Sequence, residues 1–279
     1  MTVTAQDGLA ATAARFVAAP AFPQALRQYS ESLAELRQGP RLLNKLLSQD
    51  ASWRVIGYML YLHADREQFG PDGGATYSRL LELCTRRGEV GRRTLKTTLA
   101  LMRLAGFIRA RANPVDRRIK FYQPTERMLG FVRRWLAYPA GALDCLEPQF
   151  ERVRRLRDDP RFLERFLISG GRHFTSTVPP TERMPEFHFF FDGPEGALVV
   201  LIALVLAAIQ GAPAPSRSAI AKRFGLSKTQ VTRVLTAGTE QGFFTLDGDG
   251  VPALTRAARE GYDRWVALEL AFYAAHMQQ

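Results

Sequence analysis

The chain has 279 residues, which suits two domains better than one, because single hydrophobic cores stop growing near about 250 residues. Its hydrophobic fraction of 46% and charged fraction of 23% exclude disordered, collagen-like and fibrous chains. No basic segment precedes the first apolar residues, and the longest apolar run, 196–209, is too short for a bilayer. We therefore expect a soluble cytoplasmic protein.

Residues with catalytic or metal-binding chemistry are sparse. The two cysteines, Cys84 and Cys145, cannot form a disulfide framework, and no Cys/His spacing indicates a metal site. The four histidines belong to no HExxH motif, and the sequence has neither a nucleophile elbow nor a phosphate-binding loop. We expect a protein that is not an enzyme and needs neither cofactor nor metal. Cys84 fits a buried structural thiol better than a redox sensor.

Positive charge is concentrated in the first half of the chain. Residues 1–140 hold 22 Lys and Arg against 11 Asp and Glu, whereas residues 141–279 hold 16 of each. Most of the excess lies in 76–120, with 12 basic and 3 acidic residues. A codon bias would explain that 33 of the 38 basic residues are Arg, but it would act on both halves alike. The asymmetry favours a polyanionic partner.

Three pairs of similar segments recur in the same order along the chain and indicate an internal duplication. The pairs are 36–47 with 156–167, 104–108 with 240–244, and 125–135 with 255–265. We infer an N-terminal segment 1–23, a first module 24–140 and a second module 141–279. The second module contains an insertion, 168–195, that has no counterpart in the first.

The first copy has the element order of a winged helix. Apolar periodicity predicts helices over 53–64, 78–87, 91–105 and 125–138, the last of them amphipathic. In the helix 91–105, Leu95, Leu99 and Met102 form a buried stripe. A short helix, a turn and this second helix match the helix-turn-helix pattern. The residues expected on the exposed face are Arg92, Arg93, Lys96, Thr97 and Arg103.

Two alternating segments, 108–111 and 118–122, predict a β-hairpin directly after that helix. A basic hairpin in this position is a wing, placed where it can contact phosphates or the minor groove. The basic residues of the wing 108–122 are Arg109, Arg111, Arg117, Arg118 and Lys120.

The second copy repeats the plan with helices over 197–209, 216–224, 227–241 and 255–276. Ser227 and Gln230 form a capping box that starts the helix 227–241. The candidate DNA contacts of this copy are Arg217, Lys228, Thr229, Thr232 and Arg233. Its hairpin, 245–251, is short and acidic and would repel phosphate. This copy therefore contacts DNA only through its helix or serves as a structural partner.

The segments 219–233, 242–244 and 254–265, and their first-copy counterparts from Thr94 to Thr125, resemble bacterial winged-helix regulators of the MarR type. The resemblance implies a mainly α fold with small β-hairpin wings. It also implies transcriptional regulators that bind palindromic operators as two-fold dimers. This chain departs from that pattern because it carries two modules in tandem, as a monomeric pseudo-dimer or a homodimer.

These observations favour a sequence-specific regulator of transcription that binds double-stranded DNA. The helix 91–105 would enter the major groove, where Arg reads guanine, while the wing 108–122 would hold the phosphate backbone. Two alternatives stay open. A plasmid-type replication initiator also uses tandem winged helices, and an architectural or protein-bridging protein would need no specific DNA site.

The insertion is the one region whose role the repeats do not define. Its aromatic and cationic side chains are candidates to line a pocket for a small-molecule effector. Alternatively, the segment covers the hydrophobic core. The candidate pocket residues are Arg172, His173, Arg183, Phe187 and Phe189.

Overall fold

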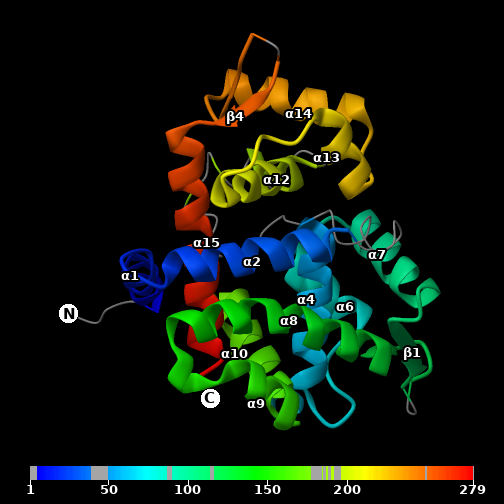
Figure 1. Cartoon of the computed structure of the whole chain (residues 1–279). Coiled ribbons are helices and arrows are strands. Elements are labelled where there is room, and N and C mark those ends of the chain that lie inside the picture. The colour runs from blue at the N-terminus through cyan, green and yellow to red at the C-terminus, as the bar shows by residue number, and fades with distance from the viewer. Residues whose placement is uncertain are drawn as a thin grey trace. The chain divides into compact units, whose positions relative to one another are not determined.

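The computed structural model describes residues 5–38, 50–86, 90–113, 116–176, 184, 187, 190–191, 196–248 and 250–278 (Figure 1). These residues form mostly α-helices together with two two-stranded antiparallel sheets. The predicted mainly helical class with small hairpins is therefore confirmed.

Helices make up most of the described elements, and each of the two hairpins lies between helices. The chain begins with α1 (Ala5–Val17), α2 (Phe22–Leu36), α4 (Asp50–Ala64), α5 (Arg66–Phe69), α6 (Tyr77–Arg86) and α7 (Arg92–Leu104). It continues through β1 (Ile108–Ala112), β2 (Lys120–Pro124), α8 (Glu126–Leu146), the 3-10 turn η1 (Pro148–Phe150), α9 (Arg152–Asp158) and α10 (Phe162–Ser176). It ends with α12 (Ala197–Gln210), α13 (Arg217–Phe224), α14 (Lys228–Glu240), β3 (Phe244–Leu246), β4 (Pro252–Leu254) and α15 (Arg256–His276).

The described residues form two compact units, each built from separate stretches of the chain. Unit 1 draws on Met1–Ser48, Tyr138–Arg152 and Pro179–Ala275, and unit 2 on Gln49–Ala137, Val153–Val178 and His276–Gln279. Unit 1 thus combines α2 with α12, α13 and α14, while unit 2 combines α4 to α7 with α10. The modules 24–140 and 141–279 are continuous stretches and do not coincide with these units. As an account of the repeats they stay a prediction.

Helix α4 lies at the centre of unit 2. Its side chains are buried on several faces, Val55 and Met59 completely, so several neighbours are needed to cover it. Helix α10 packs along α4, and α6, α7 and β2 contact it as well. The hairpin is joined to this body by the amide of Tyr122, which donates to the carbonyl of Ala75 at 2.8 Å. The core of unit 2 thus fixes α7 and the β1–β2 hairpin together.

Helix α12 has the same central role in unit 1. Its sequence is apolar on every face, and ten of its 14 residues are buried. Helix α2 packs along α12, and α13, α14 and β4 also contact it. Helix α2 is amphipathic, with Leu26 and Leu33 on its buried face. On the same face, the Ser30 hydroxyl lies 2.9 Å from the hydroxyl of Tyr262 on α15.

The sequence analysis places the end of one helix incorrectly. The predicted helix 125–138 ends at Tyr138, whereas α8 continues through Pro139 to Leu146. Proline removes one backbone hydrogen bond of a helix and disfavours the turn before it. The apolar residues beyond it, Ala142 and Leu143, are fully buried. Their burial outweighs the local cost, so the helix continues.

Candidate nucleic-acid interface

Helix α7 has one apolar face that anchors it in unit 2. Leu95, Leu99 and Met102 are buried at helical spacing, as predicted, against α4, α6 and β1. The helix starts after Gly91, which offers no side chain to cap its first amide groups. It ends where Gly106 adopts a φ of +71°, a conformation that favours glycine. These constraints fix which face of α7 points outward.

The outward face of α7 carries its basic residues. The side chains that are exposed there are Arg92, Arg93, Lys96, Thr97 and Arg103, the same five that the periodicity places outside. Within the part of the chain that the structure describes, none of the four cationic ones forms an ion pair. Their charges are therefore not neutralised by these neighbours and remain available to an external anion.

The β1–β2 hairpin adds a second group of cations to unit 2. The strands pair Ile108 with Pro124 and Ala112 with Lys120. Two of the exposed basic side chains have partners: Arg109 donates to the Gln123 amide oxygen at 3.2 Å, and Arg111 pairs with Asp72 at 3.3 Å. Contacts of this exposed kind are worth at most about 1 kcal/mol, so they are easily exchanged. The remaining exposed cations are Arg117, Arg118 and Lys120.

The two hairpins are held to their neighbouring helices by matching hydrogen bonds. The Thr125 hydroxyl donates to the carbonyl of Gly106 at 2.8 Å, and the Thr255 hydroxyl donates to that of Gly242 at 2.8 Å. Gly242 ends α14 with a φ of +76°. In each case the threonine hydroxyl also accepts a hydrogen bond from the amide three residues later. The two glycines therefore define equivalent positions in α7 and α14.

Helix α14 presents a weaker basic face in unit 1. Val231 and Leu235 are buried as predicted, and the predicted capping box between Ser227 and Gln230 is present. Of the candidate DNA contacts on α14, three are exposed and Thr232 is half-buried. The exposed three are Lys228, Thr229 and Arg233.

The β3–β4 hairpin differs from β1–β2 in charge and in surface. It contains no Lys or Arg between 243 and 255, and its exposed apolar side chains are Leu246 and Val251. The Asp247 carboxylate accepts the Val251 amide at 2.8 Å and so shapes the turn. Arg217, a predicted DNA contact, is half-buried and donates to the Gly250 carbonyl at 3.2 Å. In this structure Arg217 supports the hairpin.

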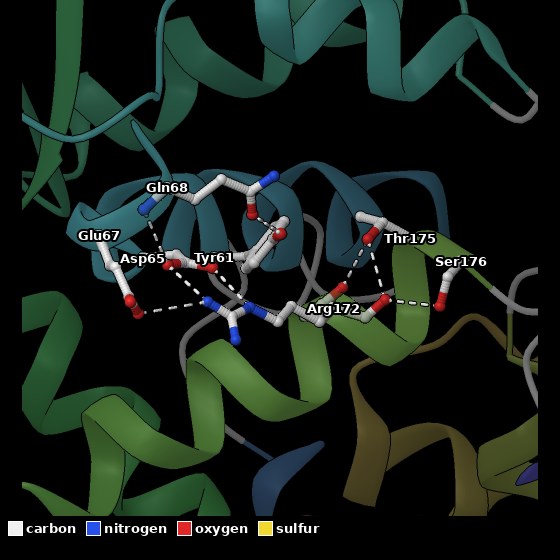
Figure 2. A network of polar contacts seen from close by, with 8 residues as sticks. Tyr61, Asp65, Glu67, Gln68, Arg172, Thr175 and Ser176 are labelled. Atoms are coloured by element: carbon white, nitrogen blue, oxygen red, sulfur yellow. Dashed lines mark hydrogen bonds and ion pairs between the residues drawn. The ribbon is translucent and has the colours of Figure 1, made fainter. Parts of the chain in front are cut away.

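The first candidate pocket residue, Arg172, is bound within unit 2 (Figure 2). Its guanidinium donates two hydrogen bonds to the fully buried carboxylate of Asp65, at 2.8 and 3.0 Å. Asp65 also accepts the amide of Gln68 at 3.3 Å and caps α5. The Tyr61 hydroxyl donates to the Gln68 side chain at 2.9 Å, and burial raises the pKa of Tyr61. This network ties α10 to the end of α4.

Of the other candidate pocket residues, the structure describes His173 and Phe187, which belong to different units. His173 lies against His276, with ring centroids 5.0 Å apart, and burial lowers the pKa of His173. Phe187 is a buried residue of unit 1, whereas Arg172 and His173 belong to unit 2. Arg183 and Phe189 lie outside the described residues. The effector pocket stays a prediction.

Two phenylalanines of the insertion, Phe187 and Phe190, fill space inside unit 1. A Cβ atom added to Gly261 would lie 2.8 Å from the ring of Phe187, and one added to Gly238 would overlap the ring of Phe244 and approach Phe190. At the positions in unit 2 that correspond to these glycines, the residues are Phe131 and Met102, both buried. Phe187 and Phe190 of the insertion, together with Phe244 of β3, thus occupy volume that larger side chains occupy in the other unit.

Two sets of residues escape the sequence analysis. Lys222 and Arg223 are exposed on α13, next to α14, and would have been found by counting charge on both predicted helices, 216–224 and 227–241. Asp65 and its bond to Arg172 join residues 107 apart in the sequence, and no local pattern indicates that pairing.

Comparisons of the chain with models of known families, with curated proteins and with solved structures find no match. No helix of the described residues is both long and apolar enough to cross a membrane. In the same residues, no group of three or more His, Cys, Asp and Glu is placed to hold a metal ion.

Proposed function

We propose that the protein is a sequence-specific DNA-binding regulator of transcription, built from two winged helix-turn-helix modules that arose by duplication. In this proposal α7 is the recognition helix and enters the major groove. The β1–β2 hairpin is a basic wing on the phosphate backbone. Helix α14 is a second recognition helix of lower affinity or a structural copy. The partner is double-stranded DNA.

The observation that carries the proposal is the exposed basic face of α7 beside a basic hairpin. Residues near the N-terminus of a recognition helix contact base edges, and Arg92, Arg93 and Lys96 occupy the first two turns of α7. Arginine binds guanine in a bidentate manner, at about 1–3 kcal/mol of discrimination per good pair. The hairpin cations suit phosphate contacts, which supply affinity and salt dependence but little sequence information.

The repeated element order supports the duplication. Two short helices, a hairpin and a 21-residue helix occur in α6 to α8 and again in α13 to α15. Thr125 with Gly106, and Thr255 with Gly242, make the same hydrogen bond beside each hairpin. This order is the one expected for winged helices of the MarR type.

Two double variants of the full chain test the assignment of roles. The variant Arg92→Ala with Arg93→Ala removes base contacts and is expected to abolish preference for a selected duplex over a random one. The variant Arg117→Ala with Arg118→Ala removes phosphate contacts. It is expected to weaken binding to every duplex alike and to reduce the salt slope by about 2. Binding is measured by fluorescence anisotropy over a range of salt concentrations.

A matched control removes the same charge elsewhere on unit 2. Arg133 and Arg134 are exposed on α8, outside α7 and the hairpin, so Arg133→Ala with Arg134→Ala should leave the preference for the selected duplex unchanged. Equal losses on all sequences from both test variants would contradict base reading by α7. An absence of binding to any duplex would overturn the proposed function.

A further inference from the structure

Helices α7 and α14 present different side chains at the same four outward positions. The glycines that end them, Gly106 and Gly242, make matching hydrogen bonds, so residues at equal distances before these glycines correspond. The four pairs, α7 residue first, are Arg92 with Lys228, Arg93 with Thr229, Lys96 with Thr232, and Thr97 with Arg233. Arginine, lysine and threonine are all DNA-reading residues, but no pair is identical.

The difference moves arginine along the helix. Arg92 and Arg93 occupy the first two of the four positions in α7, whereas the only arginine of the four in α14 is Arg233, at the last position. Four residues of an α-helix span about 6 Å, which is close to two base-pair steps of about 3.4 Å. Two helices docked in the same way would therefore contact guanines at different places in their half-sites.

Helix α14 keeps what it needs to contact bases. Lys228, Thr229 and Arg233 are exposed, and the capping box fixes the start of the helix that carries them. Residues 216–242 hold five basic residues against one acidic residue. The β3–β4 hairpin, in contrast, has no Lys or Arg that could contact the phosphate backbone of DNA. Contacts of unit 1 with DNA would therefore be made mainly by helices α13 and α14.

We propose that the two units read different sequences, so that the chain recognises a DNA site made of two dissimilar half-sites. The α7 half-site supplies most of the affinity and salt dependence. The α14 half-site adds discrimination through Lys228, Thr229 and Arg233. This inference rests on the proposed function and extends it, because it assigns base reading to α14.

The test exchanges the outward residues of α7 for those of α14 in the full chain. The variant carries Arg92→Lys, Arg93→Thr, Lys96→Thr and Thr97→Arg, all at exposed positions. Wild type and variant are each used to select bound sequences from random duplex DNA. We expect two dissimilar motifs for the wild type. For the variant, we expect the α14 motif to be retained and the α7 motif to be replaced by a second copy of it.

A second variant, Lys228→Ala with Arg233→Ala, removes the α14 contacts while α7 stays intact. It is expected to lose only the α14 motif and to bind the wild-type site about tenfold more weakly or worse. Identical wild-type motifs would overturn the inference, as would a single motif that this variant leaves unchanged. A wild-type chain that enriches no sequence at all would instead contradict the proposed function itself.

Discussion

The α7–β1–β2 region of unit 2 and the α14–β3–β4 region of unit 1 share a backbone plan but differ at the surface. Thr125 and Thr255 hold their hairpins to the preceding helices by the same hydrogen bonds. The first hairpin is strongly basic, whereas the second has no Lys or Arg. A few residues at the turns are thus enough to maintain the frame, and the outward side chains are free to change.

The interiors of the two units also have different residues at corresponding positions. Met102 fills a position in α7 at which α14 has Gly238, and Phe131 fills a position in α8 at which α15 has Gly261. The lost volume is replaced by rings from elsewhere in the chain, Phe187 among them. The space is filled in both units, although by side chains from different positions in the chain.

The largest expected effects on the free energy of unfolding come from variants at the two positions where α7 and α14 are packed differently. Met102→Ala should lower the free energy of unfolding by about 3 kcal/mol, because it leaves a cavity. Gly238→Ala should lower it by about 2 kcal/mol, because the new methyl group overlaps the Phe244 ring. Both are measured by denaturant unfolding followed by tryptophan fluorescence. A neutral Gly238→Ala would show that the Phe244 ring does not occupy that space.

The next effect concerns the anchor between α4 and α10 in unit 2. Arg172→Ala should lower the free energy of unfolding by about 2 kcal/mol, because the buried Asp65 carboxylate loses its charged partner. The Arg172 side chain is half-exposed, so its removal costs little buried contact. Arg157→Ala is a matched control, since Arg157 and its partner Asp158 are both exposed, and it should leave the free energy of unfolding nearly unchanged. Equal effects of the two variants would contradict a structural role for the anchor.

Acid should act on unit 2 chiefly through the two histidines whose pKa values are lowered most, His63 and His276. Burial lowers the pKa of His63 to about 4, helped by Arg66 and Arg109, and burial lowers that of His276 to about 4, helped by His173. The unfolded chain binds these protons near pH 6.5, so stability is full above that value and falls as the pH drops toward 4. We expect about 1 kcal/mol per histidine, since both rings are partly exposed.

The acid effect is measured as the free energy of unfolding at several pH values. A Trp265→Phe background leaves Trp53 and Trp135, both in unit 2, as the fluorescent reporters. His63→Gln and His276→Gln should each flatten the profile between pH 6.5 and 4. An unchanged slope in both variants would place the acid sensitivity elsewhere.

Positive charge added to the β3–β4 hairpin should make its contribution to DNA binding more like that of the β1–β2 hairpin. Leu246→Arg with Val251→Arg places two cations at exposed positions of the β3–β4 hairpin. If unit 1 contacts DNA, affinity should rise severalfold and the salt slope should increase by about 2. The neutral pair Leu246→Gln with Val251→Gln is the control. Identical binding by both pairs would show that this hairpin lies away from DNA.

The smallest effect concerns how the two helices begin. Ser227→Ala removes the capping box of α14 and should cost about 1 kcal/mol. Gly91 provides no side-chain cap for α7, so Gly91→Ser should stabilise by only a few tenths of a kcal/mol. Thermal unfolding of the two variants measures both changes. A loss of similar size from Gly91→Ser would contradict the open geometry around that residue.

The sequence predicts the local elements well and their packing partners poorly. The apolar stripe of Leu95, Leu99 and Met102 defines α7 to within a residue or two, and the capping box locates the start of α14. The pairing of α2 with α12, and of α10 with α4, joins distant stretches of chain. Local periodicity shows that a helix has a buried face but not what covers it.

The exposed face of the candidate site could be predicted, because it depends on local spacing alone. The packing depends on distant segments and could not be predicted. Outward positions follow from the spacing of inward ones, so the exposure of Arg92, Arg93 and Lys96 needs no knowledge of distant contacts. The hydrogen bond from Arg217 to the Gly250 carbonyl could not be predicted, because it depends on how the hairpin folds back. Local spacing predicts which face of a helix is exposed, but not the contacts that its side chains make with distant segments.

The most direct test of the central claim is the ratio of affinities for a selected and an unrelated duplex, measured with the full chain across a range of salt concentrations. Reading of bases by α7 predicts a ratio of about 1,000 or more that survives as salt weakens both complexes. A ratio near one at every salt concentration would contradict the account, because it would leave the basic surface with phosphate contacts alone.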